Sequence, residues 1–336
     1  MCPQVANDGK VIGDEDCLYL NVYSPVKNTF KGVLLPVMVW IHGGGFFGGS
    51  AGPSQFDPKY LLEKDIVLVA MNYRLAILGF FSTGDSVAPG NFGLKDQNFA
   101  LKWVQKNIQF FGGDPNRVTI FGESAGGASI NFHAISDASN GLFHQYIIES
   151  GSVLAAWSYR ERSLFKPHVD KVAKKLGCPI NSSADVVKCL KKQTAAQLLT
   201  ALIFQTLDFP ALNWMPTDEP KSEEAFLTDS PENLVKQNKM KNCPVISGNV
   251  HDEGLLVTLQ LVSPKRLPGQ VYVPEGPPST FCPSASRRNN KEREFFPEHA
   301  MSPASAPRAA SPVKIGINVK KLPTFEVRDK IRRALT

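Results

Sequence analysis

The sequence predicts an α/β fold with a mostly parallel central sheet and helices on both faces. Two observations support this prediction: apolar runs that are typical of buried strands, and stretches of helical spacing between those runs. A parallel strand that is covered on both faces is nearly continuous in apolar residues, and the connection to the next strand is usually a helix. Ligands of such sheets bind beyond the carboxyl ends of the strands, so site residues are expected there.

Strands and helices alternate along the chain in the order that this fold requires. Runs rich in β-branched and apolar residues predict strands, and apolar residues that recur on one side of a helix predict helices. The predicted strands are 18–23, 34–41, 66–72, 118–121, 146–148 and 244–247. The predicted helices are 94–110, 127–135, 161–176 and 183–201.

The charge of the chain is concentrated near its end. The net charge is +6 over 336 residues, but residues 1–262 hold 23 Lys and Arg against 25 Asp and Glu, and the remaining 74 residues hold 14 against 6. The part that we expect to fold therefore lacks the basic footprint of a nucleic-acid-binding domain, and no nucleic-acid partner is expected. No run of about 18 apolar residues occurs, so we expect no membrane span.

The cysteines bear on the compartment in which the protein works. Cys178 and Cys189 bracket a short loop that contains the glycosylation sequon Asn181-Ser182-Ser183, which suggests a disulfide in an oxidising compartment. Cys2 and Cys17 could close a second loop. The alternative is that all six cysteines are reduced thiols. No C-x-x-C motif is present, so a structural zinc site is not expected.

The segment Gly122-Glu123-Ser124-Ala125-Gly126 lies between a predicted strand and a predicted helix. A G-x-S-x-G segment in that place is typical of a nucleophile elbow, a turn so tight that its flanking positions cannot carry side chains. The serine is then presented at a helix N-terminus, where backbone N–H groups favour a developing negative charge. Ser124 is the candidate nucleophile, although the pattern by itself is weak evidence because glycine and serine are common.

A glycine-rich segment, His42-Gly43-Gly44-Gly45-Phe46, directly follows the predicted strand 34–41. Consecutive glycines leave backbone N–H groups free to converge on an anion, which is how an oxyanion hole is built. The alternative is a flexible glycine turn, and the elbow further along the chain makes the oxyanion hole the better interpretation. Gly44, Gly45 and the amide of Ala125 are the expected donors, and His42 is expected to support the loop.

Further motifs recur in order over residues 2–260. They are E-D-C-L-Y-L-N-V-Y (15–23), N-Y-R-L (72–75), G-N-F-G-L-K-D-Q (90–97), F-G-G-D-P (111–115), G-L-F-H (141–144) and D-E-G (252–254). With the glycine-rich loop and the elbow, this set resembles the type-B carboxylesterase and cholinesterase family of α/β-hydrolases. The segments 214–219 and 225–227 resemble the insect esterases most. The resemblance implies an α/β-hydrolase fold that is incomplete at both ends.

The resemblance also implies a Ser–Glu–His triad. Ser124 matches the nucleophile and Glu253 matches the acid that orients the histidine, although by itself Glu253 would be interpreted as a solvated carboxylate. Ser124 would attack an ester carbonyl while Gly44, Gly45 and Ala125 bind the oxyanion, and water would hydrolyse the acyl-enzyme. The implied partner is a small-molecule ester, with no cofactor and no metal.

The general base is missing from the matched motifs. The family places it in a His-Gly motif far beyond the glutamate, whereas 83 residues follow Glu253 and their one histidine, His299, has a different context. We therefore expect this chain to stop before the catalytic histidine. The alternatives are a non-catalytic binding or adhesion protein of the same superfamily, and an inactive isoform.

The family resemblance assigns Cys2–Cys17 and Cys178–Cys189 to disulfides, and Arg74 and Asp96 to a buried ion pair. A secreted protein that is glycosylated at Asn181 follows as an expectation. The chain opens Met1-Cys2-Pro3-Gln4 without an apolar signal region, so we expect the true N-terminus to lie upstream. The sequence leaves the oligomeric state open.

Apolar carboxylic esters are the expected substrates. The Cys2–Cys17 loop contains no tryptophan, the residue with which cholinesterases hold a quaternary ammonium, so choline esters are not expected. Aromatic residues that either line an acyl pocket or belong to the core are Phe46, Phe47, Phe204, Phe209 and Trp214.

Composition divides the chain into three parts. Residues 1–262 are the expected partial hydrolase domain. Residues 263–312 contain 10 of the 25 prolines and 7 serines, which predicts a disordered insertion. Residues 313–336 have apolar residues at roughly helical spacing, which predicts a basic amphipathic helix that resumes the domain.

Overall fold

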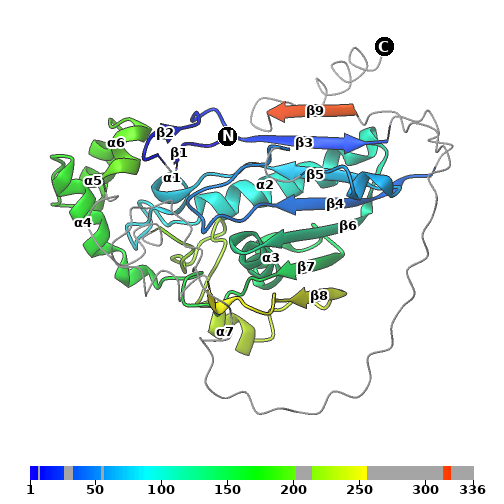
Figure 1. Ribbon diagram of the computed structural model, residues 1–336. Helices are drawn as coiled ribbons and strands as arrows, with labels where there is room; N and C mark the ends of the chain where they lie inside the picture. Colours follow the sequence, from blue (N-terminus) through cyan, green and yellow to red (C-terminus); the bar gives the residue numbers. More distant parts are fainter. Residues whose placement is uncertain (7, 26–32, 54–56, 202–213, 256–312, 319–336) are drawn as a thin grey trace, which may run out of the picture.

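A seven-stranded sheet organises the computed structural model, which describes residues 1–6, 8–25, 33–53, 57–201, 214–255 and 313–318 (Figure 1). The strands of this sheet are β3 (Tyr19–Ser24), β4 (Leu35–Ile41), β5 (Val67–Met71), β6 (Gly113–Glu123), β7 (Gln145–Glu149), β8 (Val245–Gly248) and β9 (Val313–Asn318). Their spatial order is β8-β7-β6-β4-β5-β3-β9. A separate antiparallel pair consists of β1 (Gln4–Val5) and β2 (Val11–Ile12).

The sheet is mostly parallel. Each neighbouring pair from β8 to β5 is parallel, whereas β3 is antiparallel to both β5 and β9. All five residues of β5 are buried, as a strand that is covered on both faces requires. The predicted α/β fold with a mostly parallel sheet is therefore confirmed.

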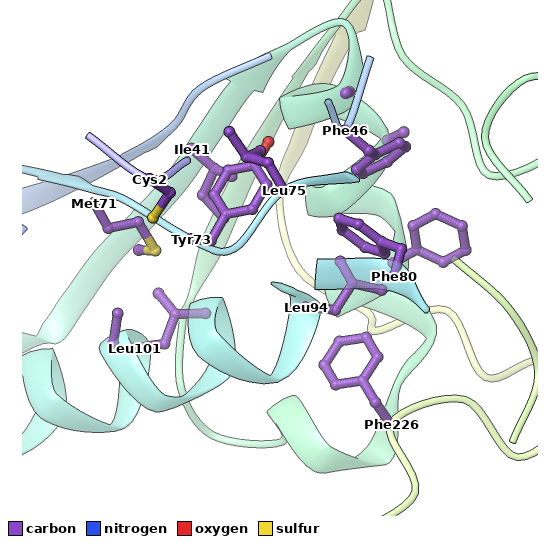
Figure 2. Packing of buried hydrophobic residues seen from close by; sticks show 14 of the residues in the cluster. Cys2, Ile41, Phe46, Met71, Tyr73, Leu75, Phe80, Leu94, Leu101 and Phe226 are labelled. Carbon is purple, nitrogen blue, oxygen red and sulfur yellow. The ribbon is translucent and has the colours of Figure 1, made fainter. Parts of the chain in front are cut away.

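Two long helices cover one face of the sheet. They are α2 (Phe92–Asn107) and α3 (Ala125–Ile135), and both contribute side chains to the larger core cluster. In Figure 2, Leu94 and Leu101 project from α2 toward the segment that carries Met71, Tyr73 and Leu75. The remaining helices are α1 (Ala76–Phe80), α4 (Lys166–Lys175), α5 (Ser183–Leu190), α6 (Ala195–Thr200) and α7 (Pro231–Lys236), with short 3-10 turns η1 (Leu61–Glu63), η2 (Ile108–Phe111), η3 (Asp137–Ser139) and η4 (Arg162–Leu164).

The opposite face of the sheet carries a smaller apolar cluster. Trp40 of β4 and Phe121 of β6 belong to it, and their ring centroids lie 4.9 Å apart. Leu62 of η1 packs against this cluster, to which no α-helix of the described residues contributes, so the expected helices on this second face stay a prediction. The two clusters follow from alternation, because successive residues of a strand point to opposite faces.

Among the described helices, none is both long and apolar enough to cross a bilayer.

The predicted helix over 183–201 is two helices, α5 and α6. Thr194 begins the second, because its side chain accepts a hydrogen bond from the Gln197 amide while the Gln197 side chain accepts one from the Thr194 amide. This reciprocal capping box satisfies N–H groups that a helix start would otherwise leave unpaired. The prediction of one continuous helix is therefore wrong, because the helical spacing is interrupted between Leu190 and Ala195.

The predicted helix over 313–336 is wrong at its start, because Val313–Asn318 is strand β9. Its sequence Val-Lys-Ile-Gly-Ile-Asn alternates apolar and other residues, which is the period of a strand, and β3 offers it an edge to pair with. Residues 319–336 and the predicted insertion 263–312 lie outside the described residues. The division of the chain at 262 stays a prediction.

Two disulfides and one ion pair that were expected from the resemblance are present. Cys2 joins Cys17 and Cys178 joins Cys189, with Cα atoms 4.8 and 5.7 Å apart. The Arg74 guanidinium donates to both carboxylate oxygens of Asp96 at 2.7 Å. This ion pair ties the segment after β5 to helix α2.

A buried chain of hydrogen bonds runs beneath helix α3. Gln97 of α2 donates at 3.1 Å to the Ser129 hydroxyl, which donates to the Ala125 carbonyl. The Gln97 side-chain oxygen lies 3.1 Å from His133 Nε2, and Ser139 Oγ lies 2.7 Å from His133 Nδ1. The Gln97 side-chain oxygen can only accept a hydrogen bond, so we assign the proton of the neutral imidazole to Nε2. Nδ1 then accepts a hydrogen bond from the Ser139 hydroxyl.

Acid should destabilise the protein through His133. Burial, and then the charge of Lys241, lowers the pKa of His133 from 6.5 to about 3. Between these two pH values the unfolded state binds a proton on His133 and the folded state does not. The free energy of unfolding is unaffected by this group above pH 6.5. It falls as the pH drops from 6.5 toward 3, by about 1.4 kcal/mol per pH unit for this group. Urea unfolding between pH 7 and 4 should show a shallower decline in His133→Gln than in the parent chain. Equal slopes would contradict the assignment.

Candidate active site

Ser124 lies at the turn between strand β6 and helix α3. Its backbone has φ 55° and ψ −120°, a conformation that costs energy for any residue with a side chain. The Ser124 amide donates to the Glu149 carbonyl at 2.9 Å, and the Ser124 carbonyl accepts from the Ala128 amide at 2.8 Å. Packing and hydrogen bonds thus hold the serine in a strained turn at the start of the helix.

Glycines beside Ser124 allow the turn to pack closely on β4. A Cβ atom at Gly122 would lie 2.6 Å from the Ile41 carbonyl oxygen, and one at Gly126 would meet the same oxygen even more closely. A Cβ atom at Gly127 would lie 2.6 Å from the Glu149 carbonyl oxygen. The segment therefore has the strand–turn–helix geometry of a nucleophile elbow, as the sequence predicts.

The glycine-rich loop lies directly beside the elbow. A Cβ atom at Gly43 would lie 3.2 Å from Ser124 Cβ, so the loop and the serine are in contact. Gly44 and Gly45 have φ of 97° and 59°, and neither amide forms a hydrogen bond with a described residue. Ala125 is the first residue of α3, where the N–H group has no partner within the helix. The three expected oxyanion donors thus come from adjoining segments.

The glycine-rich loop is anchored at both ends. The Gly44 carbonyl accepts from the amides of Phe47 and Gly48, each at 3.0 Å, which closes a tight turn. The Gln4 side chain accepts from the Gly49 amide and donates to the Gly49 carbonyl, both at 2.9 Å. Gln4 lies near the Cys2–Cys17 disulfide, so the N-terminal segment positions the loop. The sequence motifs gave no signal for this role of Gln4.

His42 supports the loop, as expected. Its Nδ1 lies 2.8 Å from the Gly43 carbonyl oxygen, and its ring stacks on Tyr73 with centroids 4.3 Å apart. The Tyr73 hydroxyl donates to the His42 carbonyl at 2.8 Å. Burial lowers the pKa of His42 to about 4, partly offset by the hydrogen bond to Gly43. The imidazole is neutral at physiological pH, with Nδ1 donating to the carbonyl.

Three carboxylates at the elbow lie within electrostatic range of one another, those of Glu123, Glu149 and Glu253. Desolvation raises the pKa of Glu123, and the negative charges of Glu149 and Glu253 raise it further. The Glu123 side chain reaches solvent, but one carboxylate oxygen lies 3.0 Å from the Cβ position of Gly43, which shields that end. Glu253 is exposed and accepts a hydrogen bond from the Val250 amide at 3.2 Å. The candidate acid therefore lies within electrostatic range of the elbow.

The described histidines are engaged elsewhere, and no hydrogen bond joins one of them to Ser124 among the described residues. His251 is exposed and its Nδ1 lies 2.9 Å from Asp252. His299 lies outside the described residues. The partners of the other four are Gly43 and Tyr73 (His42), Gln97 and Ser139 (His133), Val118 (His144) and Arg160 (His168). None of the described histidines is therefore positioned to act as a general base for Ser124.

Two of the five aromatic residues considered for an acyl pocket belong to the core. Phe46 is fully buried and packs on Phe80, with ring centroids 5.1 Å apart (Figure 2). Trp214 is 5% exposed and packs on Phe81. Phe47 is exposed, whereas Phe204 and Phe209 lie outside the described residues. The core alternative therefore holds for Phe46 and Trp214.

A groove of about 280 Å³ lies between β3 and α2, away from the elbow. Its lining includes none of the candidate catalytic residues and consists of Leu18, Tyr19, Met71, Asn72, Lys95, Asp96, Phe99 and Ala100.

Replacing Gly126 by alanine should destabilise the fold, because the new Cβ atom would overlap the Ile41 carbonyl. We expect a loss of about 1–3 kcal/mol in the free energy of unfolding, as for other overpacked sites. Urea denaturation measures it. Gly248→Ala is the control, since nothing lies within 4 Å of its Cβ position. Similar unfolding midpoints for the two variants would contradict the close packing of the elbow.

Comparison with known proteins places this arrangement in a family. The chain is 47% identical over 261 residues to juvenile hormone esterase of Tribolium castaneum and 45% identical over 258 residues to esterase FE4 of Myzus persicae. Each alignment covers 75% of this chain and 44% of the relative, so the chain spans less than half the length of these relatives. Cholinesterase 1 of Branchiostoma lanceolatum is 40% identical over 244 residues, which are 71% of this chain and 68% of that protein. The sequence profile described as "Carboxylesterase family" matches residues 1–293, and this chain belongs to that family.

Proposed function

We propose that the protein hydrolyses carboxylic esters through an acyl-enzyme formed on Ser124. The observation that carries this proposal is the strained Ser124 turn with the Gly43–Gly45 loop packed against it. In that arrangement the Ser124 hydroxyl attacks the ester carbonyl, and the amides of Gly44, Gly45 and Ala125 bind the oxyanion that forms. The intermediate then breaks its bond to the ester's alcohol oxygen, which leaves as the alcohol with the proton taken from Ser124, and the acyl group stays on Ser124. Water hydrolyses this acyl-enzyme, which releases the acid and restores the Ser124 hydroxyl.

Glu253 is proposed to orient the histidine that acts as general base. Its position is supported by its electrostatic effect on Glu123, which is adjacent to Ser124. Without a base a serine is a weak nucleophile, and loss of one triad member costs several orders of magnitude in rate. Since no described histidine bonds to Ser124, the reactivity of Ser124 is the quantity to measure.

Apolar carboxylic esters are the proposed substrates. The Cys2–Cys17 loop carries no tryptophan for a cation–π contact with a choline head group. Two of the relatives are named as insect esterases, one of them for juvenile hormone. These observations favour uncharged esters over choline esters.

The protein is proposed to work outside the cell. The two disulfides support an oxidising compartment. Asn181 is exposed in the turn before α5, where an attached glycan meets no packed surface.

If the chain holds a working general base, a serine-directed fluorophosphonate should label it at Ser124. Ser124→Ala should abolish labelling, and Ser222→Ala, which changes an exposed serine, should retain it. Quantified labelling by gel fluorescence and mass spectrometry decides the outcome. Absence of labelling in the folded parent chain would contradict an active esterase and favour the non-catalytic binding protein or the inactive isoform.

Secretion from insect cells behind an added signal peptide should yield a chain that carries N-glycan at Asn181. Glycosidase treatment should increase the gel mobility of the parent chain and leave Asn181→Gln unchanged. An Asn238→Gln control should behave like the parent chain. A glycosidase shift that persists in Asn181→Gln would contradict this site.

A further inference from the structure

Six lysines repeat one pattern on two successive helices. The pattern K-x-x-K-K occurs at Lys171, Lys174 and Lys175 near the end of α4, and again at Lys188, Lys191 and Lys192 at and after the end of α5. All six side chains are exposed. We call residues 166–192, which contain both helices, the basic lobe. It lies at the left of Figure 1, at the end of the sheet toward which the parallel strands point.

The Cys178–Cys189 disulfide brings the two lysine clusters together. Cys178 follows the first cluster by three residues, and Cys189 lies within the second cluster, next to Lys188. The Cα atoms of the two cysteines are 5.7 Å apart. The covalent bond therefore joins the segment that follows the first cluster to the second cluster, although like charges repel.

The charge of the clusters is not neutralised locally. None of the six lysines forms an ion pair with a described residue. Asp170 of the basic lobe is engaged with Lys166 at 2.8 Å, and Asp185 accepts a hydrogen bond from the Ser182 hydroxyl at 2.7 Å. Within residues 1–262, where acidic residues slightly outnumber basic ones, the basic lobe holds seven lysines against these two aspartates.

Lysines near a helix C-terminus also complement the helix dipole, which is a purely local reason for their presence. The interaction with the helix dipole falls off within the last turn, and one or two cations at each helix are enough to provide it. It does not require the same triple pattern on both helices, with a disulfide to join them. A ligand with several negative charges accounts for both features.

We propose that the basic lobe binds a linear sulfated polysaccharide. Lysine ammonium groups act as point charges that suit spaced sulfate groups, and the clusters contain no arginine fork for bidentate recognition of a phosphate. A membrane surface is a poorer partner, because Ile180 is the one large apolar side chain exposed among the described residues of the basic lobe. Two adjacent clusters offer a polymer more contacts than a single small anion can use.

Heparin is the probe for this proposal, with the full chain as the protein. Lys188→Gln/Lys191→Gln/Lys192→Gln should raise the Kd for heparin at least about tenfold at physiological salt, because cation–polyanion contacts release counterions. Lys64→Gln/Lys102→Gln/Lys221→Gln, which removes the same charge from exposed lysines elsewhere, should leave the Kd within about twofold, since charges beyond a Debye length are screened. Cys178→Ser/Cys189→Ser keeps every lysine and should also weaken binding.

Residues 263–336 are themselves basic and can retain the parent chain on heparin. The difference in heparin affinity between the two triple variants therefore tests whether the basic lobe is the binding site. Equal effects of the two triple variants, or no effect of either, would overturn the basic lobe as the site. Tighter binding of the parent chain to vesicles of anionic phospholipid than to heparin would overturn the polysaccharide. Near-ultraviolet circular dichroism confirms that each variant is folded. Lower thermal stability with unchanged heparin affinity would assign the lysines to the helix dipole instead.

Discussion

The close approach of the Ser124 turn to the end of β4 is the constraint on which the rest of the site depends. In the sheet register Ile41 lies opposite Gly122, and the Ile41 carbonyl is the atom that a side chain at Gly122 or Gly126 would meet. His42 and the glycine-rich loop follow Ile41 directly. The same contact therefore sets the strain at Ser124 and places the loop beside it.

The glycine-rich loop has its own supports, which come from two separate parts of the chain. The His42 ring lies against Tyr73, which follows β5, and the Tyr73 hydroxyl returns a hydrogen bond to the His42 carbonyl. Gln4 holds Gly49 from the N-terminal segment, which the Cys2–Cys17 disulfide ties to the start of β3. Fixed donors of this kind bind a developing negative charge without having to reorganise during the reaction.

Local sequence patterns predicted the central strands well and predicted helix boundaries less well. The runs at 34–41 and 66–72 correspond to β4 and β5, because a strand covered on both faces has a strong apolar signal. The division of 183–201 into α5 and α6 depends on the capping box at Thr194, which apolar spacing does not detect. At 313–318, a period of two was mistaken for part of a helical pattern.

The sequence by itself determined the fold class, the elbow, the glycine-rich loop and the two disulfide pairings, since each depends on residues close together in the chain or on family motifs. Only the tertiary structure decided which ionisable groups face one another. Burial beside Tyr73 keeps His42 neutral, and the charges of Glu149 and Glu253 act on Glu123 because three parallel strands end at one edge. The core position of Phe46 is likewise a tertiary outcome. Charge and burial depend on neighbours that are distant in sequence, so no local pattern specifies them.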